Sequence, residues 1–265
     1  MKKQEFSGKK EKIDNMLIKG GYPFYGEAIG IMLNSTTYPL IPGNVGNAST
    51  YSFPVRMVST PDLPTDWWCD SRGADKDRLG KVVETAKKLE AEGVRAITTG
   101  CGFYAIFQKE VAEAVKIPFF SSPLLMVPII HRMLGEKGRI GIITAGATAG
   151  AKNLDARYLD AVGIDSKKIP LGIVGMMEYD EFRQVIMEES KKEADINFME
   201  SEVLDAVKKL LQKYPDTEAL VFECSDLPPF SKAVQDLTGL PVFDFITMIN
   251  WVYTAVVQRK YHGFM

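Results

Sequence analysis

The chain has 265 residues and a net charge of −2, with 46% hydrophobic and 25% charged residues, a composition typical of a globular protein with a sizeable core. The charge balance and the lack of a basic block argue against nucleic acid as a partner, and no run approaches the roughly 18 apolar residues of a membrane span. Three distant cysteines form no disulfide framework, and two histidines without a CxxC motif predict no metal site. The polar N-terminus lacks the apolar core of a signal peptide, so we expect a cytoplasmic location.

The first half alternates predicted strands and helices. An apolar strand is predicted at 28–33, followed by an amphipathic helix whose apolar residues recur every three or four positions from 79 to 89. A buried strand at 96–99 then leads to Cys101, and a further helix and a short strand at 117–120 close the unit.

The second half has the same order of elements. An apolar strand is predicted at 139–144, an amphipathic helix around 203–211, and a buried strand at 219–222 that leads to Cys224. A short strand at 240–243 follows. Each cysteine is therefore expected where a strand ends and a helix begins.

The two halves can be aligned directly. The segment VRAITTGCGFYAIFQKEVAEAVKIPFFSS from Val94 matches TEALVFECSDLPPFSKAVQDLTGLPVFDF from Thr217 without a gap, and Cys101 then meets Cys224 at an offset of 123. Two further matches occur upstream in the same order, which predicts a duplicated fold.

The predicted fold class is α/β, with two pseudo-symmetric lobes, mainly parallel sheets flanked by helices, and an active site in the interlobe cleft. Ligands bind beyond the carboxyl ends of the strands in such sheets, where both cysteines lie. We expect the lobes to span 1–134 and 135–265. A final helix at about 248–260 has no counterpart in the first half and is expected to pack back on the first lobe.

A thiol at the start of a helix faces unpaired N–H groups and the positive end of the helix dipole, and both favour the thiolate. The Cys-x5-Arg loop of cysteine phosphatases is absent, because Phe107 and Phe230 stand at the arginine position. The sequence contains no CxxC motif, which argues against a redox-active disulfide. The natural remaining chemistry has Cys101 and Cys224 on either side of one substrate carbon, one removing a proton and the other returning it.

The motifs Thr99-Gly-Cys101-Gly and Val-Phe-Glu-Cys224-Ser-Asp-Leu-Pro resemble the aspartate/glutamate racemase superfamily, which includes hydantoin racemases, maleate isomerases and arylmalonate decarboxylases. The resemblance extends from about 28 to 245. It implies an isomerase that needs no cofactor, pyridoxal phosphate included, with Cys101 and Cys224 as catalytic acid/base thiols. The substrate-binding positions that it implies are Asn34, Ser35, Gly102, Thr144, Thr148, Ser225 and Asp226.

The sequence departs from glutamate racemases at several of these positions. Asn34 stands where those enzymes have an aspartate, and Ser225-Asp226 replace a threonine–histidine pair. An acid at 226 raises the pKa of a nearby thiol and repels a second carboxylate of a substrate. It is equally suited to cap the helix that follows.

The function predicted from these features is racemisation or epimerisation of a small carboxylate-bearing compound, an amino acid above all, by two-base thiol proton transfer. A neutral or amine-bearing side chain is expected in place of a second carboxylate. The alternatives are an enzyme like maleate isomerase or a decarboxylase, with one cysteine as nucleophile or acid, and a small-molecule binding protein. Assembly into a homo-oligomer is left open by the sequence.

Overall fold

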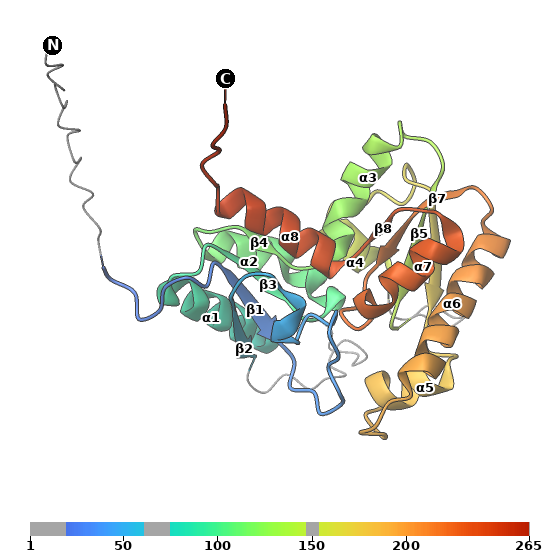
Figure 1. Cartoon of the computed structure of the whole chain (residues 1–265), viewed down its shortest axis with the longest axis horizontal. Helices are drawn as coiled ribbons and strands as arrows, with labels where there is room; N and C mark the ends of the chain where they lie inside the picture. The colour runs from blue at the N-terminus through green and yellow to red at the C-terminus, as the bar shows by residue number, and fades with distance from the viewer. Residues whose placement is uncertain (1–19, 61–74, 147–153, 265) are drawn as a thin grey trace, which may run out of the picture.

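The computed structural model describes residues 20–60, 75–146 and 154–264 (Figure 1). Cys69 and the predicted binding residue Thr148 lie outside the described residues. Each half contains a four-stranded parallel sheet, ordered β2-β1-β3-β4 and β6-β5-β7-β8. The strands are β1 (Ile29–Leu33), β2 (Val55–Ser59), β3 (Ala96–Thr99), β4 (Phe119–Phe120), β5 (Arg139–Thr144), β6 (Leu171–Gly175), β7 (Thr217–Phe222) and β8 (Val242–Phe243). The predicted α/β class with two related lobes is confirmed.

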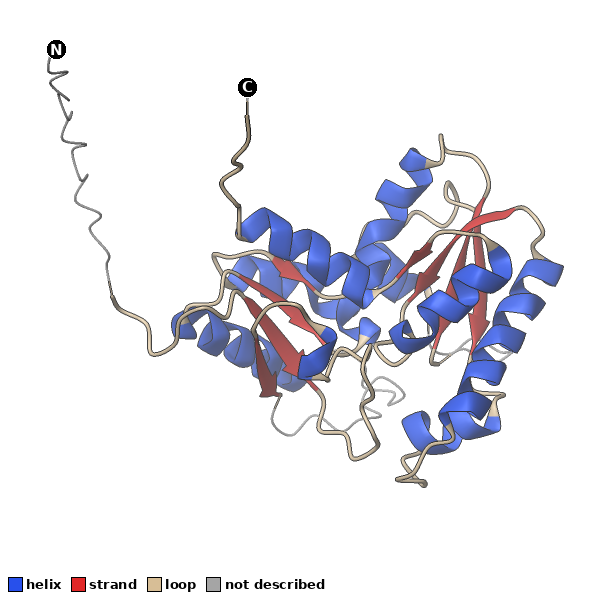
Figure 2. Cartoon of the chain, in the orientation of Figure 1, coloured by secondary structure: helices blue, strands red, loops and turns tan. Residues whose placement is uncertain are grey.

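Helices flank both sheets (Figure 2). The α-helices are α1 (Lys76–Glu92), α2 (Gln108–Ala114), α3 (Val127–Met133), α4 (Ala156–Ala161), α5 (Asp180–Phe182), α6 (Ile196–Lys213), α7 (Ser231–Thr238) and α8 (Phe245–Val256). Shorter helical turns are η1 (Ala48–Thr50), η3 (Gly102–Phe107), η4 (Pro123–Met126), η5 (Arg183–Met187) and η6 (Pro228–Phe230). None of the described helices is long and apolar enough to span a membrane.

The internal duplication holds at the level of strand register. Ile29 of β1 pairs with Ala96 of β3, and Ile140 of β5 pairs with Ala219 of β7, positions that the sequence alignment of the halves makes equivalent. The pairing of β3 with β4 is reproduced residue for residue by that of β7 with β8. Cys101 and Cys224 therefore leave their sheets at matching points.

The longest helix of each half begins at an aspartate cap and buries one apolar face. Asp75 accepts a hydrogen bond from the backbone N–H of Arg78 at the start of α1, which ends at Gly93 in the left-handed conformation (φ 98°). Asp195 caps α6 in the same way. The buried residues of α1 and α6 repeat at helical spacing and cover their sheets: Val82, Ala86 and Leu89 in α1, and Met199, Val203, Ala206, Val207 and Leu210 in α6.

The last helix of each half crosses to the other sheet. The helix α3 follows β4 in the chain and packs on β5, whereas α8 follows β8 and packs on β3. In α8 the ring of Tyr253 stacks on Phe53, with ring centroids 3.5 Å apart, and the carbonyl of Val256 accepts a hydrogen bond from Arg95. The expectation that the final helix has no counterpart is wrong, because α3 is its shorter equivalent.

The sequence patterns missed some elements. The edge strands β2 and β6 were not predicted, and α8 starts and ends before the expected 248–260. One apolar core runs between the halves, where the rings of Phe103 and Tyr158 meet edge to face at 5.2 Å. A second core lies under α6. The shared core fixes how the strand ends of the two sheets face each other.

Candidate functional site

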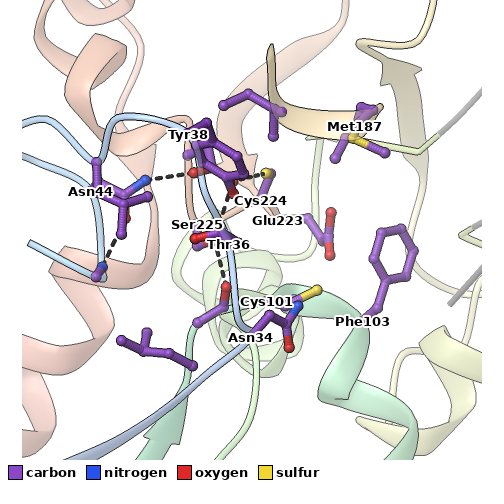
Figure 3. A pocket seen from close by; sticks show the side chains of 18 of the residues that line it. Asn34, Thr36, Tyr38, Asn44, Cys101, Phe103, Met187, Glu223, Cys224 and Ser225 are labelled. Carbon is purple, nitrogen blue, oxygen red and sulfur yellow. Dashed lines mark hydrogen bonds between the residues drawn. The ribbon is translucent and has the colours of Figure 1, made fainter. Parts of the chain in front are cut away.

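The site is a pocket formed where β1, β3, β5 and β7 end (Figure 3). Both halves contribute to it, so it lies in the interlobe cleft as predicted. Its lining comes from the residues that follow these strands, from the loop after β1 and from the end of η5. The described residues that line it include Asn34, Thr36, Tyr38, Asn44, Cys101, Gly102, Phe103, Met187, Glu189, Glu223, Cys224, Ser225 and Asp226.

Cys101 precedes the first turn of η3 and is half-buried. Its sulfur receives hydrogen bonds from the backbone N–H of Phe103 and from the side chain of Asn34, and both lower the thiol pKa. The Asn34 side chain is held by the hydroxyl of Tyr104, which donates to Asn34 Oδ1 at 2.9 Å. Burial and the negative charge of Glu223 outweigh these bonds and raise the pKa of Cys101 well above its ordinary value.

Cys224 follows β7 and is buried. Its thiol donates to Asp226 Oδ2 at 3.4 Å. Burial raises the pKa of Cys224 well above its ordinary value, and the charges of Asp226 and Glu223 add to the effect. The low thiol pKa values predicted from the helix starts are therefore wrong. Desolvation and two neighbouring acids outweigh the few N–H groups, so both cysteines rest as neutral thiols.

Asp226 ties the two halves together across the pocket. Its carboxylate accepts hydrogen bonds from Asn44 Nδ2 at 2.5 Å and from the hydroxyl of Tyr38 at 3.2 Å, both in the loop after β1. The hydroxyl of Ser225 lies 3.4 Å from Asp226 Oδ2. Burial raises the pKa of Asp226, while these donors lower it. The alternative role as a helix cap does not apply, because no side chain caps η6 and the carboxylate faces the thiol of Cys224.

Glu223 is a second carboxyl group in the pocket that the sequence reasoning did not select. The residue is fully buried. Its Oε2 accepts a hydrogen bond from the hydroxyl of Thr144 at 2.7 Å. Its Oε1 has no hydrogen-bond partner among the described residues. Burial raises the pKa of Glu223 to about 7, although the bonds from Thr144 and from the backbone of Ala145 lower it.

The structure brings most of the predicted residues to the pocket. Lining positions are occupied by Cys101, Cys224, Asn34, Gly102, Ser225 and Asp226. Ser35 is exposed and does not line the pocket. Thr144 is fully buried and reaches the site only through Glu223. The catalytic and binding roles of these residues stay predictions.

The sequence patterns do not single out two groups of lining residues. Tyr38 and Asn44 lie in a loop and meet Asp226 across more than 180 positions of the chain, a contact that no local pattern encodes. Glu223 ends an apolar strand, and its charge, placed directly before Cys224 in a buried run, was the one available signal.

Comparison with known proteins finds a matching family model and several similar sequences. A family model described as Asp/Glu/Hydantoin racemase matches residues 50–251. The chain is 28% identical to a dimethylsulfoniopropionate lyase from Durusdinium sp. clade D, over 89% of this chain and 77% of that protein. Four relatives from Emiliania huxleyi, 24–27% identical, are also named dimethylsulfoniopropionate lyases.

Solved structures share the fold at low sequence identity. A sulfate-associated form of arylmalonate decarboxylase aligns with a TM-score of 0.58 at 14% identity, covering 88% of this chain and 94% of that one. A glutamate racemase from Bacillus anthracis aligns with a TM-score of 0.56 at 14% identity, covering 88% and 82%. With the family model matching most of its length and the fold matching these enzymes, the chain belongs to the Asp/Glu/Hydantoin racemase family of enzymes.

Proposed function

We propose that this enzyme is a lyase that breaks the carbon–sulfur bond of a small sulfonium carboxylate, 3-dimethylsulfoniopropionate or a close analogue, by β-elimination. The observation that carries the proposal is that acidic side chains, and no basic ones, are among the described residues lining the pocket. Glu189, Glu223 and Asp226 are among the described residues that line it, and no lysine, arginine or histidine is. A pocket of this kind favours a substrate whose second functional group is a cation rather than another carboxylate.

The names of the five relatives support the same substrate class, because dimethylsulfoniopropionate carries both a sulfonium cation and a carboxylate. In the proposed complex the sulfonium group lies beside Asp226 and the ring of Tyr38. An aromatic face attracts such a cation by about 0.5–2 kcal/mol, and a carboxylate at 4 Å adds about 4 kcal/mol before desolvation at an effective dielectric constant of about 20.

The bound cation also explains how a neutral thiol can become a base. The thiol of Cys224 donates a hydrogen bond to Asp226, and a positive charge beside the pair lowers the thiol pKa. We assign Cys224 as the base: with the cation bound, its thiol releases a proton to solvent, and the thiolate takes a proton from the carbon next to the substrate carboxylate. The electrons of that C–H bond form the carbon–carbon double bond, and the C–S pair leaves with sulfur. The products are acrylate, neutral dimethyl sulfide and one proton.

The same charges disfavour substrates with two carboxylates. Aspartate, glutamate and a malonate each place a second negative group near Asp226, where two like charges 4 Å apart repel by about 1–4 kcal/mol. Racemisation of acidic amino acids and decarboxylation of a malonate are therefore weaker candidates for this pocket.

Racemisation of another small acid, such as a neutral or amine-bearing amino acid, is the second candidate. The observation that favours it is the matching register that places Cys101 and Cys224 at equivalent strand ends. Racemisation needs two groups, one on each face of a carbon, whereas elimination of dimethyl sulfide needs one base and no acid, because the leaving group departs uncharged.

Incubation in heavy water with NMR detection separates the two. The purified protein is mixed with 3-dimethylsulfoniopropionate or with a panel of L- and D-amino acids, and vinyl protons and deuterium at the α-carbon are followed. We expect acrylate and dimethyl sulfide in equal amounts from the sulfonium substrate. Deuterium exchange at the α-carbon of an amino acid, with no acrylate from the sulfonium compound, would establish the racemase in its place. The double variant Cys101→Ser/Cys224→Ser is the matched control.

A further inference from the structure

The elimination described above does not use one carboxyl group of the pocket. The carboxyl group of Glu223 is fully buried in the pocket wall, and Figure 3 shows it between Cys224 and Phe103. Its Oε2 is occupied by the hydroxyl of Thr144, whereas its Oε1 has no partner among the described residues. A buried carboxyl oxygen without a partner costs free energy, which a hydrogen bond to a ligand would offset.

The neighbouring backbone shows where Oε1 points. A Cβ atom added at Gly102 would overlap Glu223 Oε1, so the missing side chain of Gly102 makes room for this oxygen. Gly102 directly follows Cys101, and the charge of Glu223 is the largest charged influence on the Cys101 thiol. Oε1 is therefore on the Cys101 side of the pocket, while Asp226 is bound to Tyr38 and Asn44.

The hydrogen bonds also locate the proton of a neutral Glu223. Because Thr144 donates to Oε2, the carboxylic acid carries its proton on Oε1, where it is free to donate. The titratable groups that face Glu223 from the elements around it are Asp226, Cys101, Cys224 and Tyr158. None of them is a cation, and burial keeps the pKa of Glu223 near 7, so the neutral form is well populated at neutral pH.

We propose that neutral Glu223 donates a hydrogen bond from Oε1 to the carboxylate of the substrate and so fixes that group at the Cys101 side of the pocket. This inference rests on the proposed function, whose sulfonium group then lies at the opposite side, beside Asp226. The pocket thus has one end that accepts a carboxylate and one that accepts a cation.

The same bond assists the reaction. Removing a proton next to a carboxylate moves further negative charge onto its oxygens, and the described lining supplies no lysine or arginine to offset it. A buried, neutral carboxylic acid fills this role because it donates a strong hydrogen bond without bringing a charge of its own. An ionised Glu223 would repel the same carboxylate, so the bond is lost as pH rises through the pKa of Glu223.

Two variants of similar size distinguish a hydrogen-bond donor from a carboxylate. Glu223→Gln keeps an N–H donor at this position, whereas Glu223→Met keeps only the volume. We expect Glu223→Met to lower kcat/KM for the sulfonium substrate roughly 10- to 100-fold, the effect of one hydrogen bond to a charged group. Glu223→Gln should lose far less and should no longer show the fall in activity near pH 7. Glu84→Gln and Glu84→Met on the exposed face of α1 are matched controls.

Binding of propionate tests the inference without turnover. Isothermal titration at pH 5.5 to 8.5 should show wild-type affinity falling about tenfold per pH unit above the pKa of Glu223, while the affinity of Glu223→Gln stays level. Equal loss in the Gln and Met variants, or wild-type affinity that does not change with pH, would overturn the assignment. If propionate binds as expected but the sulfonium compound is not cleaved, the proposed function fails and the carboxylate site stands.

Discussion

Glu223 occupies in the second half the position that Gly100 occupies in the first. The N–H of Glu223 donates to the carbonyl of Ile143 at 2.9 Å, and that of Gly100 donates to the carbonyl of Met32 at 2.7 Å. The backbone at the two strand ends is thus equivalent, but only the second half has an acidic side chain at this position. Two equivalent thiols face a pocket whose acids, among the described lining residues, all come from the second half, which suits a substrate with two different ends better than a symmetric exchange.

Glu223 makes the stability of the folded protein fall as pH rises. Its folded pKa of about 7 lies above the ordinary 4.5, so the folded state holds a proton that the unfolded state releases. This contribution is fully present below about pH 4.5 and is lost as pH rises to about 7. Urea unfolding at pH 5 and pH 8.5 should show that Glu223→Gln lacks about 2.5 kcal/mol of the wild-type decrease. Parallel decreases in the two proteins would contradict a raised pKa.

Thr144 sets the pKa of Glu223 without touching the substrate. Its hydrogen bond to Oε2 favours the ionised form, so Thr144→Val should raise the pKa of Glu223 further. If the neutral acid is the active form, the alkaline limb of the kcat/KM profile moves to higher pH by about one unit. Activity that instead rises with pH, on a limb that Thr144→Val moves to higher pH, would show that the carboxylate is the working form. The double variant Glu223→Gln/Thr144→Val should show a kcat/KM that does not change with pH, which controls for effects of Thr144→Val on packing.

Asp226→Asn should reverse the charge preference of the pocket. Removing this carboxylate weakens the attraction for a sulfonium group and also removes the acceptor of the hydrogen bond from the Cys224 thiol. We expect kcat/KM for the sulfonium substrate to fall at least tenfold, while succinate, as a dicarboxylate probe, binds more tightly. Inhibition constants for succinate and values of kcat/KM for the sulfonium substrate are measured on the wild-type protein and on Asp226→Asn. Unchanged binding of both ligands would mean that the side chain does not face the substrate.

The two cysteines should differ in their importance for elimination. Cys224→Ser removes the assigned base and should lower kcat by about 10²- to 10⁴-fold. Cys101→Ser should keep a larger share of the activity, since neutral dimethyl sulfide needs no acid to leave. Steady-state rates of acrylate release measure both. Equal and complete loss in the two variants would show that both thiols take part in the chemistry.

The sequence was informative about the fold because the duplication repeats the pattern of every central element. The match between Cys101 and Cys224 predicts the register that β3 and β7 show, and the strand ends place both thiols in one cleft. The edge strands β2 and β6 escaped prediction, since Val55–Ser59 and Leu171–Gly175 are short and only partly buried.

The chemistry of the site was harder to predict because it depends on distance in space. The dipole of a helix start predicts a low pKa for each thiol, but the sequence pattern carries no measure of burial and does not show that Glu223 lies near Cys101. Asp226 had two interpretations until its contacts with Tyr38 and Asn44 placed it in the pocket. Ser35 follows β1 as expected, but its side chain faces solvent instead of the pocket.

Binding of two non-reactive analogues of equal shape tests the central claim, that the acids of this pocket select a cation, most directly. 3-(Trimethylammonio)propionate carries a positive charge, and 4,4-dimethylpentanoate replaces that nitrogen with carbon and is otherwise the same. Titration calorimetry on the wild-type protein at pH 6.5 should give at least tenfold tighter binding of the cationic compound, from its attraction to Asp226 and the ring of Tyr38. Equal binding, or tighter binding of the uncharged analogue, would contradict a sulfonium substrate.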